Sequence, residues 1–242
     1  MKNFLHVNDL SLDQLNDILE KSSWIKNKFK NKESYLPLKG LSMAMIFAKP
    51  SARTRISFET GFYKMGGHAL YLGPNDIGIG KRESVEDVAR VISRFNDIIM
   101  ARLFDHKHVL TLAKFSSCPV INGLTDYNHP CQIVADIFTI KEHMGHLDDI
   151  TISYVGDGNN IVHSWLELAQ VIPFKFNIVC PEDYKPDMDL VKSTQEKGLS
   201  EIKIFHDPFD GVVGSDVIYT DVWASMGQKE EAERRKKIFK PF

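Results

Sequence analysis

The sequence has few cysteines and no long apolar run. Cysteine occurs at Cys118, Cys131 and Cys180, an odd number without a C-x-x-C pair, which disfavours a disulfide scaffold and favours a reducing compartment. No stretch reaches the roughly 20 apolar residues that cross a membrane, and Met1–Leu10 lack the apolar centre of a signal peptide. We therefore expect a soluble cytoplasmic protein with no membrane partner.

An excess of charge of either sign is also lacking. The chain has 30 Lys and Arg residues against 32 Asp and Glu residues, a balance that disfavours a nucleic-acid partner or an acidic tail. The basic run Arg234–Lys237 follows glutamates one turn earlier, and we interpret it as a solvated helix face.

Nucleotide and metal signatures are absent or incomplete. No G-x-x-x-x-G-K-[ST] segment occurs. Gly156 and Gly158 follow a strand candidate, but a third glycine and an acidic residue on the next strand are missing, so a dinucleotide-binding dehydrogenase has weak support. The histidines and cysteines show no recognised ligand spacing, and we expect no metal.

Short apolar runs alternate with helical patterns along the chain. The strand candidates are Ser42–Phe47, Ala69–Leu72, Asp97–Ala101 and Pro119–Asn122, then Thr151–Val155, Phe176–Cys180, Glu201–Phe205 and Val217–Thr220. Helical patterns include Ile56–Met65, Val85–Phe95, Pro130–His143, Ile161–Val171 and Leu190–Lys197. This alternation predicts an α/β protein with two doubly wound parallel-sheet domains, 1–145 and 146–242.

The segment from Ser51 to Arg55 joins a buried strand to a helix. The first N–H groups of a helix have no intrahelical partner, and the helix dipole places positive partial charge there. Hydroxyls and guanidinium groups at this point add charge-assisted hydrogen bonds, as a phosphate site requires. The alternative is an ordinary capped helix with solvated arginines.

Two further clusters lie at helix starts or strand ends. His129 precedes Pro130, so it stands at a helix N-terminus, where an imidazole resists protonation and can donate to a carbonyl oxygen beside the amide of Gln132. The amides at Asn160 and the carboxylate of Asp221 follow two strands of the second domain, where they suit a small polar ligand with an ammonium group. Simple helix capping and core packing remain open for each of these residues.

In this order, the segments resemble the aspartate/ornithine carbamoyltransferase family, and within it the ornithine-type members. The motifs are Ser-x-Arg-Thr-Arg at 51–55, Gly-Lys-Arg-Glu-Ser at 80–84, Met-Ala-Arg at 100–102, Asp-x-x-His-Pro-x-Gln at 126–132, Gly-Asp-Gly-Asn-Asn at 156–160 and Asp-x-x-x-Ser-Met-Gly at 221–227. The last motif separates ornithine-type members from aspartate- and putrescine-type relatives. The resemblance implies a homotrimer.

The resemblance also implies a reaction. The δ-amine of L-ornithine attacks the carbamoyl carbon of carbamoyl phosphate, giving L-citrulline and phosphate without a cofactor. The implied phosphate ligands are Ser51, Ala52, Arg53 and Thr54. The implied catalytic residues, which also hold the carbamoyl group, are Thr54, Arg102, His129 and Gln132. The implied ornithine ligands are Asn160, Asp221, Ser225 and Met226.

The chain departs from the family pattern at several places. Ala48 stands where Glu is usual, Ala52 where Thr is usual, and Gly78 where relatives place a Gln or His that reaches a neighbouring subunit. Relatives also continue past Phe242, so we expect the second sheet to lack its last strand and helix, and the chain alone to turn over poorly. The alternatives are a non-catalytic homologue and a transferase for another amine, such as putrescine or acetylornithine.

Overall fold

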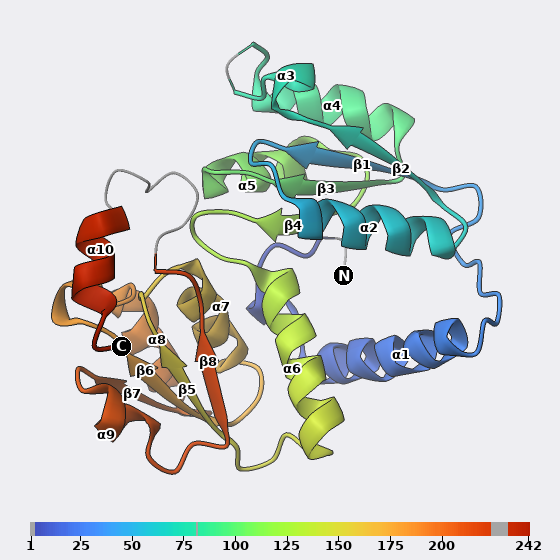
Figure 1. Ribbon diagram of the computed structural model, residues 1–242. Coiled ribbons are helices and arrows are strands. Elements are labelled where there is room, and N and C mark those ends of the chain that lie inside the picture. Colours follow the sequence, from blue (N-terminus) through green and yellow to red (C-terminus); the bar gives the residue numbers. More distant parts are fainter. Residues whose placement is uncertain (1–2, 81, 224–231) are drawn as a thin grey trace. The chain divides into compact units, whose positions relative to one another are not determined.

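The computed structural model describes residues 3–80, 82–223 and 232–242 (Figure 1). It divides into two compact units, Met1–Cys131 and Gln132–Phe242, and each is described by itself. Helix α6 (Pro130–Met144) spans this division, whereas the sequence places the domain boundary after the helix, at 145/146, which stays a prediction. Within the described residues, no helix combines the length and the apolar character needed to cross a membrane.

The first unit is built on a four-stranded parallel sheet in the order β2-β1-β3-β4. Its strands are β1 (Ser42–Phe47), β2 (His68–Leu72), β3 (Ile98–Arg102) and β4 (Val120–Leu124). Its helices are η1 (Val7–Asp9), α1 (Leu12–Lys30), α2 (Ala52–Lys64), α3 (Pro74–Ile77), α4 (Val85–Phe95) and α5 (His106–Phe115). Strand β1 is buried almost throughout because helices cover both faces of the sheet.

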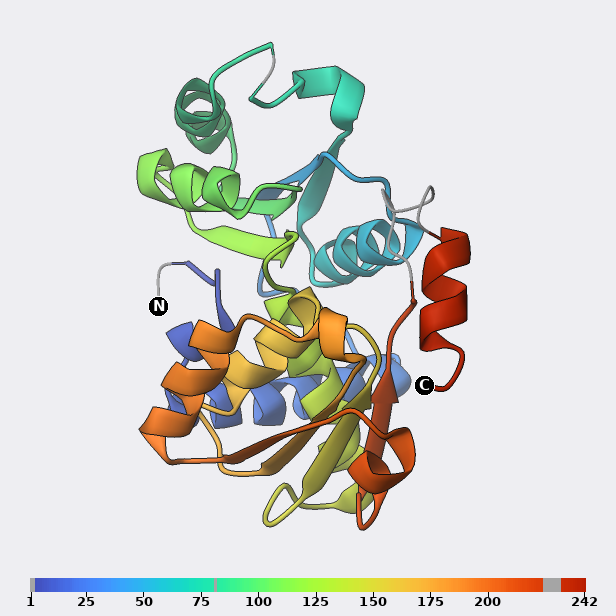
Figure 2. The same ribbon diagram turned by 90° about the vertical axis from the view of Figure 1, so that its left-hand side faces the viewer.

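Alternate side chains of β1 and β3 build two separate cores. Ala44, Ile46 and Ile99 pack with buried residues of α4 and α5 on one face. Met45 and Met100 pack with residues of α2 on the other face. The views agree that α2 lies on the opposite side of the sheet from α4 and α5 (Figure 2). Because successive side chains of a strand point to opposite faces, each strand contributes to both cores. The sheet can therefore pack against helices on both faces, as in a doubly wound unit.

The second unit has a four-stranded parallel sheet in the order β7-β6-β5-β8. Its strands are β5 (Thr151–Val155), β6 (Lys175–Val179), β7 (Glu201–Phe205) and β8 (Val217–Thr220). Its helices, besides most of α6, are α7 (Asn160–Leu168), η2 (Glu182–Tyr184), α8 (Met188–Lys197), α9 (Pro208–Val212) and α10 (Ala232–Phe239). In the described part, β8 is an edge strand, and Ile218 on it is 64% exposed.

Trp165 on α7 is the centre of the second unit's core. Its ring lies about 6 Å from those of Phe174, Phe176 and Tyr219, and it is fully buried. Aromatic rings at these separations add to the stabilisation that comes from area burial alone. Helix α7 is therefore held firmly against the sheet, which positions its N-terminus at the carboxyl ends of the strands.

Strand order places a topological switch point in each sheet. In the first unit the chain leaves β1 toward β2 on one side and later returns to β3 on the other. In the second unit β6 lies on one side of β5 and β8 on the other. The two connections diverge at these points, which leaves a crevice outside the carboxyl ends of the strands, where open α/β sheets bind ligands.

The predicted fold class, two doubly wound parallel sheets, is confirmed. All eight strand candidates form strands, with shifts of one or two residues at some ends. Helix α2 begins at Ala52, four residues before the apolar pattern that predicted it, because Ser51 caps the helix and its first turn is polar. Helix α5 was not among the named patterns.

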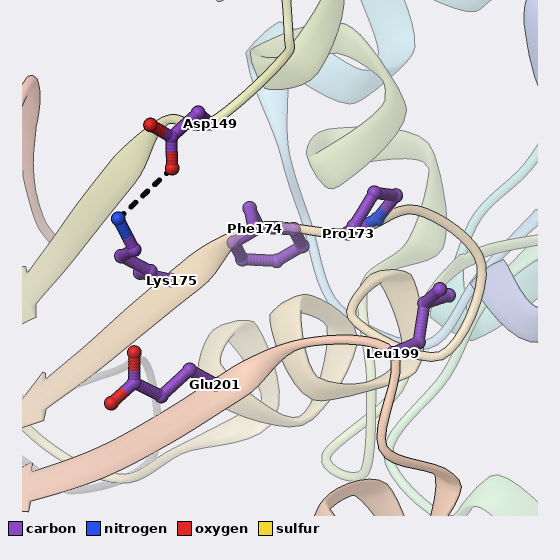
Figure 3. Close-up of a pocket in the computed structure, with 6 residues that line it drawn as sticks. All are labelled: Asp149, Pro173, Phe174, Lys175, Leu199 and Glu201. Atoms are coloured by element: carbon purple, nitrogen blue, oxygen red, sulfur yellow. Dashed lines mark hydrogen bonds and ion pairs between the residues drawn. The ribbon is translucent and has the colours of Figure 1, made fainter.

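A pocket of about 340 Å³ lies at the amino ends of the strands of the second sheet, away from their carboxyl ends (Figure 3). It is lined by residues at the amino ends of β6 and β7 and by Asp149, which pairs with Lys175 at 2.9 Å. None of the predicted site residues that the structure describes lines it. It therefore has no connection with the chemistry expected at the carboxyl edge.

Candidate functional site

The N-terminus of α2 presents hydroxyl and guanidinium groups at the first switch point. Ser51 is the N-cap, and its Oγ accepts a hydrogen bond from the backbone N–H of Thr54 at 3.3 Å. The hydroxyls of the two residues lie 3.1 Å apart. Ala52 and Arg53 are the first two residues of the helix, where backbone N–H groups have no intrahelical acceptor. This geometry suits an anion.

Arg102 reaches the same helix start from the neighbouring strand. It is the last residue of β3 and pairs in register with Phe47, the last residue of β1. Its Nη1 donates to Thr54 Oγ1 at 3.1 Å. Burial, and then the nearby Arg53 guanidinium, lower the pKa of Arg102. Its Nε is buried with no hydrogen-bond partner in the described part of the chain, so this group has unused capacity for an acceptor.

His129 completes the group in the first unit. It directly precedes α6, and burial followed by the charge of Arg102 lowers its pKa to about 3. The sequence predicted resistance to protonation from the helix dipole, and the structure adds these two causes. A neutral imidazole can donate one hydrogen bond without carrying charge. The structure thus brings Ser51, Thr54, Arg102 and His129 to one edge of the sheet.

The depressed pKa of His129 predicts a pH-dependent stability. An unfolded histidine titrates near 6.5, so between that value and about 3 the unfolded chain binds a proton that the folded chain does not. His129 should therefore lower the free energy of unfolding by about 1.4 kcal/mol for each pH unit below about 6.5, and leave it unchanged above. We expect His129→Gln to remove this slope in urea unfolding.

The exposed His68 on β2 provides the control for this measurement. His68→Gln should leave the pH dependence of stability as it is in the parent chain, because the exposed His68 takes no part in the site around His129. Parallel stability curves for the His129→Gln variant and the parent chain would show that the folded pKa of His129 is not depressed.

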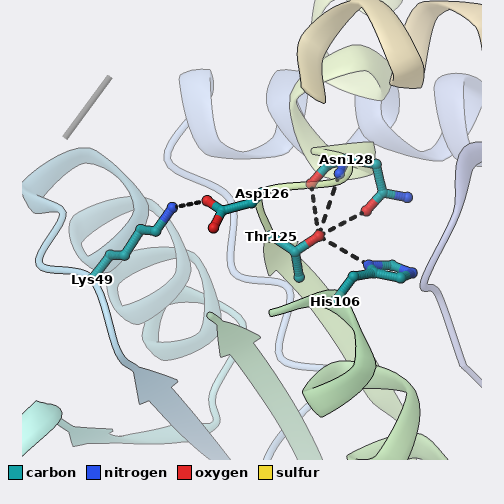
Figure 4. A network of polar contacts seen from close by, with 5 residues as sticks. All are labelled: Lys49, His106, Thr125, Asp126 and Asn128. Carbon is teal, nitrogen blue, oxygen red and sulfur yellow. Dashed lines mark hydrogen bonds and ion pairs between the residues drawn. The ribbon is translucent and has the colours of Figure 1, made fainter. Parts of the chain in front are cut away.

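Lys49 and Asp126 join the two loops of this site (Figure 4). The Lys49 ammonium forms an ion pair with Asp126 and lies 4.4 Å from the centre of the Phe104 ring. The Lys49 side chain is only 9% exposed. This contact links the loop before Ser51 to the loop before His129. The sequence assigned no role to either residue, although Asp126 lies inside one motif and Lys49 two residues before another, because a pairing 77 residues apart leaves no local pattern.

Asn159 and Asp221 meet at the switch point of the second unit. Asn159 Oδ1 caps α7 by accepting from the N–H of Ile161 at 2.9 Å. Its Nδ2 donates to Asp221 Oδ2 at 3.4 Å. Asn160 is the first residue of α7. Ser225 and Met226, the other predicted ligands, lie outside the described residues.

Gln132 is oriented by a carboxyl group that the sequence did not single out. Its Nε2 donates to Asp136 Oδ1 at 2.9 Å, and the Tyr219 hydroxyl donates to Asp136 Oδ2 at 2.9 Å. Burial, with a contribution from Asp221, raises the pKa of Asp136, while the two hydrogen bonds oppose this shift. Asp136 lies one helical turn after Gln132, a spacing that could have predicted the contact.

Arg235 of α10 forms an ion pair with Asp157, directly after β5. Its Nε donates to the backbone carbonyl of Trp223, and its guanidinium lies 4.8 Å from the centre of the Tyr184 ring. Arg235 is only 4% exposed, so the interpretation of this basic run as a solvated face is wrong at this residue. Burial raises the pKa of Asp157, and Arg235 opposes that shift.

The glycines at 156–158 have a packing role. A Cβ at Gly158 would lie 2.3 Å from the backbone nitrogen of Pro186, and the Gly158 N–H donates to the Tyr184 carbonyl at 2.9 Å. A side chain at position 158 would therefore clash with the chain segment after η2, so packing alone accounts for this glycine. This arrangement removes the support that the G-x-G pair lent to a dinucleotide site.

The fold and these two groups of side chains define a protein of two doubly wound α/β units, each with polar side chains at the carboxyl edge of its sheet. Residues 2–142 match the model of the aspartate/ornithine carbamoyltransferase carbamoyl-P binding domain, and residues 148–242 match that of the Asp/Orn binding domain. The chain belongs to the aspartate/ornithine carbamoyltransferase family. The predicted resemblance is confirmed.

Individual relatives agree with this assignment. Over its whole length the chain is 56% identical to the chloroplastic ornithine carbamoyltransferase of Pisum sativum and 47% identical to the ornithine carbamoyltransferase of Chlorobaculum tepidum. It spans 65% of the first protein and 72% of the second. The solved ornithine carbamoyltransferase of Pyrococcus furiosus matches the whole chain with a TM-score of 0.93 at 44% identity, over 78% of its own length.

Proposed function

We propose that this protein transfers the carbamoyl group of carbamoyl phosphate to the δ-amine of L-ornithine, forming L-citrulline and phosphate. The observation that carries the proposal is the group at the first switch point, where Thr54, a half-buried Arg102 and a neutral His129 lie together. The family membership and the ornithine carbamoyltransferase names of the relatives support the choice of reaction.

In the first unit, the start of α2 would hold the phosphate. Ser51, the N–H groups of Ala52 and Arg53, and the Arg53 guanidinium provide donors for its oxygens. Thr54, Arg102 and His129 would then donate to the carbamoyl oxygen as it becomes an oxyanion. Half-buried, preorganised donors act there because they need no reorganisation when charge develops. Because His129 is neutral, it adds no second positive charge beside Arg102.

In the second unit, Gln132, held by Asp136, would orient the carbamoyl amide. Asp221 and Asn160 would bind the ammonium and carboxylate of ornithine, together with Ser225 and Met226. The lone pair of the neutral δ-amine forms the new N–C bond, the C–O bond to phosphate breaks, and the proton lost by the amine leaves with the phosphate. Positioning and electrostatic stabilisation suffice for such a step.

The test is citrulline formation by the purified 242-residue chain. We expect slow turnover with carbamoyl phosphate and ornithine, and its loss in Arg53→Ala, because the phosphate loses a charge-assisted ligand. Arg90→Ala provides a matched control, since Arg90 is exposed on α4 and pairs with Asp87. An equal loss in both variants would contradict the role of Arg53.

The same assay separates the alternatives. Product formed faster from putrescine or acetylornithine than from ornithine would indicate another amine acceptor. No turnover, together with a melting temperature that carbamoyl phosphate still raises, would indicate a non-catalytic carbamoyl phosphate-binding homologue. Gly78 would fit such a loss of function, but it also ends α3 in the left-handed conformation, with φ 61°, which glycine adopts readily.

We also propose that the protein is a cytoplasmic homotrimer, as the resemblance implies. Three free cysteines suit a reducing compartment. On α2 and β2, Ile56, Tyr63 and Leu70 are exposed, and burial of such side chains between copies would stabilise an oligomer. Sedimentation of the purified chain measures the state directly, and a monomer at micromolar concentration would exclude the trimer.

A further inference from the structure

Two histidines close a ring of hydrogen bonds beside the loop that carries His129. Asn128 Nδ2 lies 3.0 Å from His6 Nδ1, and His6 Nε2 lies 3.2 Å from His106 Nε2. His106 Nδ1 lies 2.9 Å from Thr125 Oγ1, which lies 3.3 Å from Asn128 Oδ1. Figure 4 shows Thr125 between His106 and Asn128. All four residues belong to the first unit.

The backbone carbonyl of Leu5 determines which atoms donate and which accept around this ring of hydrogen bonds. This oxygen can only accept, and it lies 3.1 Å from Asn128 Nδ2 and 3.0 Å from Asn122 Nδ2. The nitrogen of the Asn128 amide therefore faces Leu5 and His6, while its oxygen accepts from Asn122 at 2.6 Å. The orientation of the amide is thus set by two neighbours that are independent of the histidines.

One tautomer for each histidine then follows. Because Asn128 donates to His6 Nδ1, the proton of neutral His6 is on Nε2 and points at His106 Nε2. His106 accepts there, so its own proton is on Nδ1 and is donated to Thr125 Oγ1. The Thr125 hydroxyl in turn donates to Asn128 Oδ1, and every bond in the ring has one donor and one acceptor.

The ring anchors the residues before His129 to the N-terminal segment. Thr125 and Asn128 are fully buried, and the Thr125 N–H donates to the Asn128 carbonyl at 2.9 Å. The N-terminal segment is fixed in turn, since the N–H of Phe4 donates to the Val120 carbonyl at 2.9 Å and Phe4 accepts from Asn122 at 2.8 Å. Displacing either imidazole would remove one side-chain contact of the Thr125–Asn128 turn, whose next residue is His129, and leave its position less tightly determined.

We propose that His6 and His106 are positioning residues that hold His129, through Asn128 and Thr125, in the place where it donates to the carbamoyl oxygen. The proposal rests on the proposed function for its catalytic consequence. The ring itself is independent of any reaction. A displacement of about 1 Å in a catalytic group costs up to about 10²-fold in rate, so the ring has a measurable effect on turnover.

Imidazole tautomers test the ring directly. Long-range ¹⁵N–¹H spectra of the full chain, assigned with His6→Phe and His106→Phe, distinguish a proton on Nδ1 from one on Nε2. We expect His106 as the Nδ1–H form and His6 as the Nε2–H form. The Nε2–H form at both residues, or averaging between forms at His106, would overturn the proposal. Failure here is distinct from failure of carbamoyl transfer, which the citrulline assay tests.

A double-mutant cycle tests the positioning role. We expect His106→Phe to lower kcat by about 10- to 100-fold, and the exposed His68→Phe to leave it unchanged. His106→Asn keeps a donor near Thr125 and should recover part of the loss. In the His129→Gln background, His106→Phe should have little further effect, because it acts through His129. The positioning role would be refuted if His106→Phe lowered kcat by the same factor in both backgrounds, or if it left kcat unchanged.

Discussion

Replacing Arg102 by alanine is expected to lower kcat for citrulline formation by about 10²- to 10³-fold, the usual cost of one oxyanion donor. Arg102 reaches the start of α2 from the end of β3, where its Nη1 bonds Thr54 at 3.1 Å. Its buried Nε has no hydrogen-bond partner among the described residues, which leaves it available to a carbonyl oxygen. Burial also strengthens its interaction with developing charge.

The Arg102→Ala substitution should lower kcat more strongly than it changes KM. An interaction that strengthens as the carbamoyl oxygen becomes negative stabilises the transition state more than the bound substrate. Arg90→Ala, at an exposed position on α4, should leave both constants unchanged. A near-normal kcat in the Arg102→Ala variant, with folding intact by melting temperature, would remove Arg102 from the site.

Replacing Asp221 by asparagine is expected to lower kcat/KM for ornithine by about 30-fold or more, because removing one member of a hydrogen-bonded charge pair costs at least about 2 kcal/mol. Asp221 lies at the end of β8, beside the cap of α7, and Asn159 donates to it at 3.4 Å. Its charge also acts on Asp136 and Asp157, whose pKa values are raised mainly by burial. A cationic ligand is therefore favoured at this edge.

The carbamoyl phosphate KM provides the internal control for Asp221→Asn and should stay within a factor of about two, since the proposed phosphate ligands lie in the first unit. Asp189→Asn, an exposed change of the same kind on α8, should alter neither constant. An unchanged ornithine KM in Asp221→Asn would assign the ammonium to another group. A loss for both substrates would point to a folding defect.

Much of the fold could be predicted because its signals are local. Most strands contain a short apolar run, and in β1, which is buried on both faces of the sheet, the run has no polar interruption after Ser42. Helix α2 was predicted late because its first turn is Ala52–Arg55, where capping and ligand groups replace the apolar period. Helix α5, with its run of apolar and basic residues after Asp105, lay between two strands and could have been found from its N-cap.

The site residues also fall into two groups, those with a local signal in the sequence and those without one. Ser51, Thr54 and His129 could be predicted because each stands at a helix start, which is visible in the sequence. The partners that determine their chemistry could not. Lys49 meets Asp126, His106 meets His6, and Arg235 meets Asp157 across 77, 100 and 78 residues of chain. Contacts of this kind depend on strand order, which no local pattern encodes.

The sequence by itself determined the alternating elements, the polar helix starts at the carboxyl ends of strands, and the motifs of the carbamoyltransferase family. These properties follow from side-chain periodicity and capping chemistry, which act over a few residues. Only the tertiary structure decided that β1 lies beside β3, so that Arg102 reaches Thr54, and that His129 is half-buried with a lowered pKa. Register and burial set those distances and the local dielectric, and both arise only when distant segments pack together.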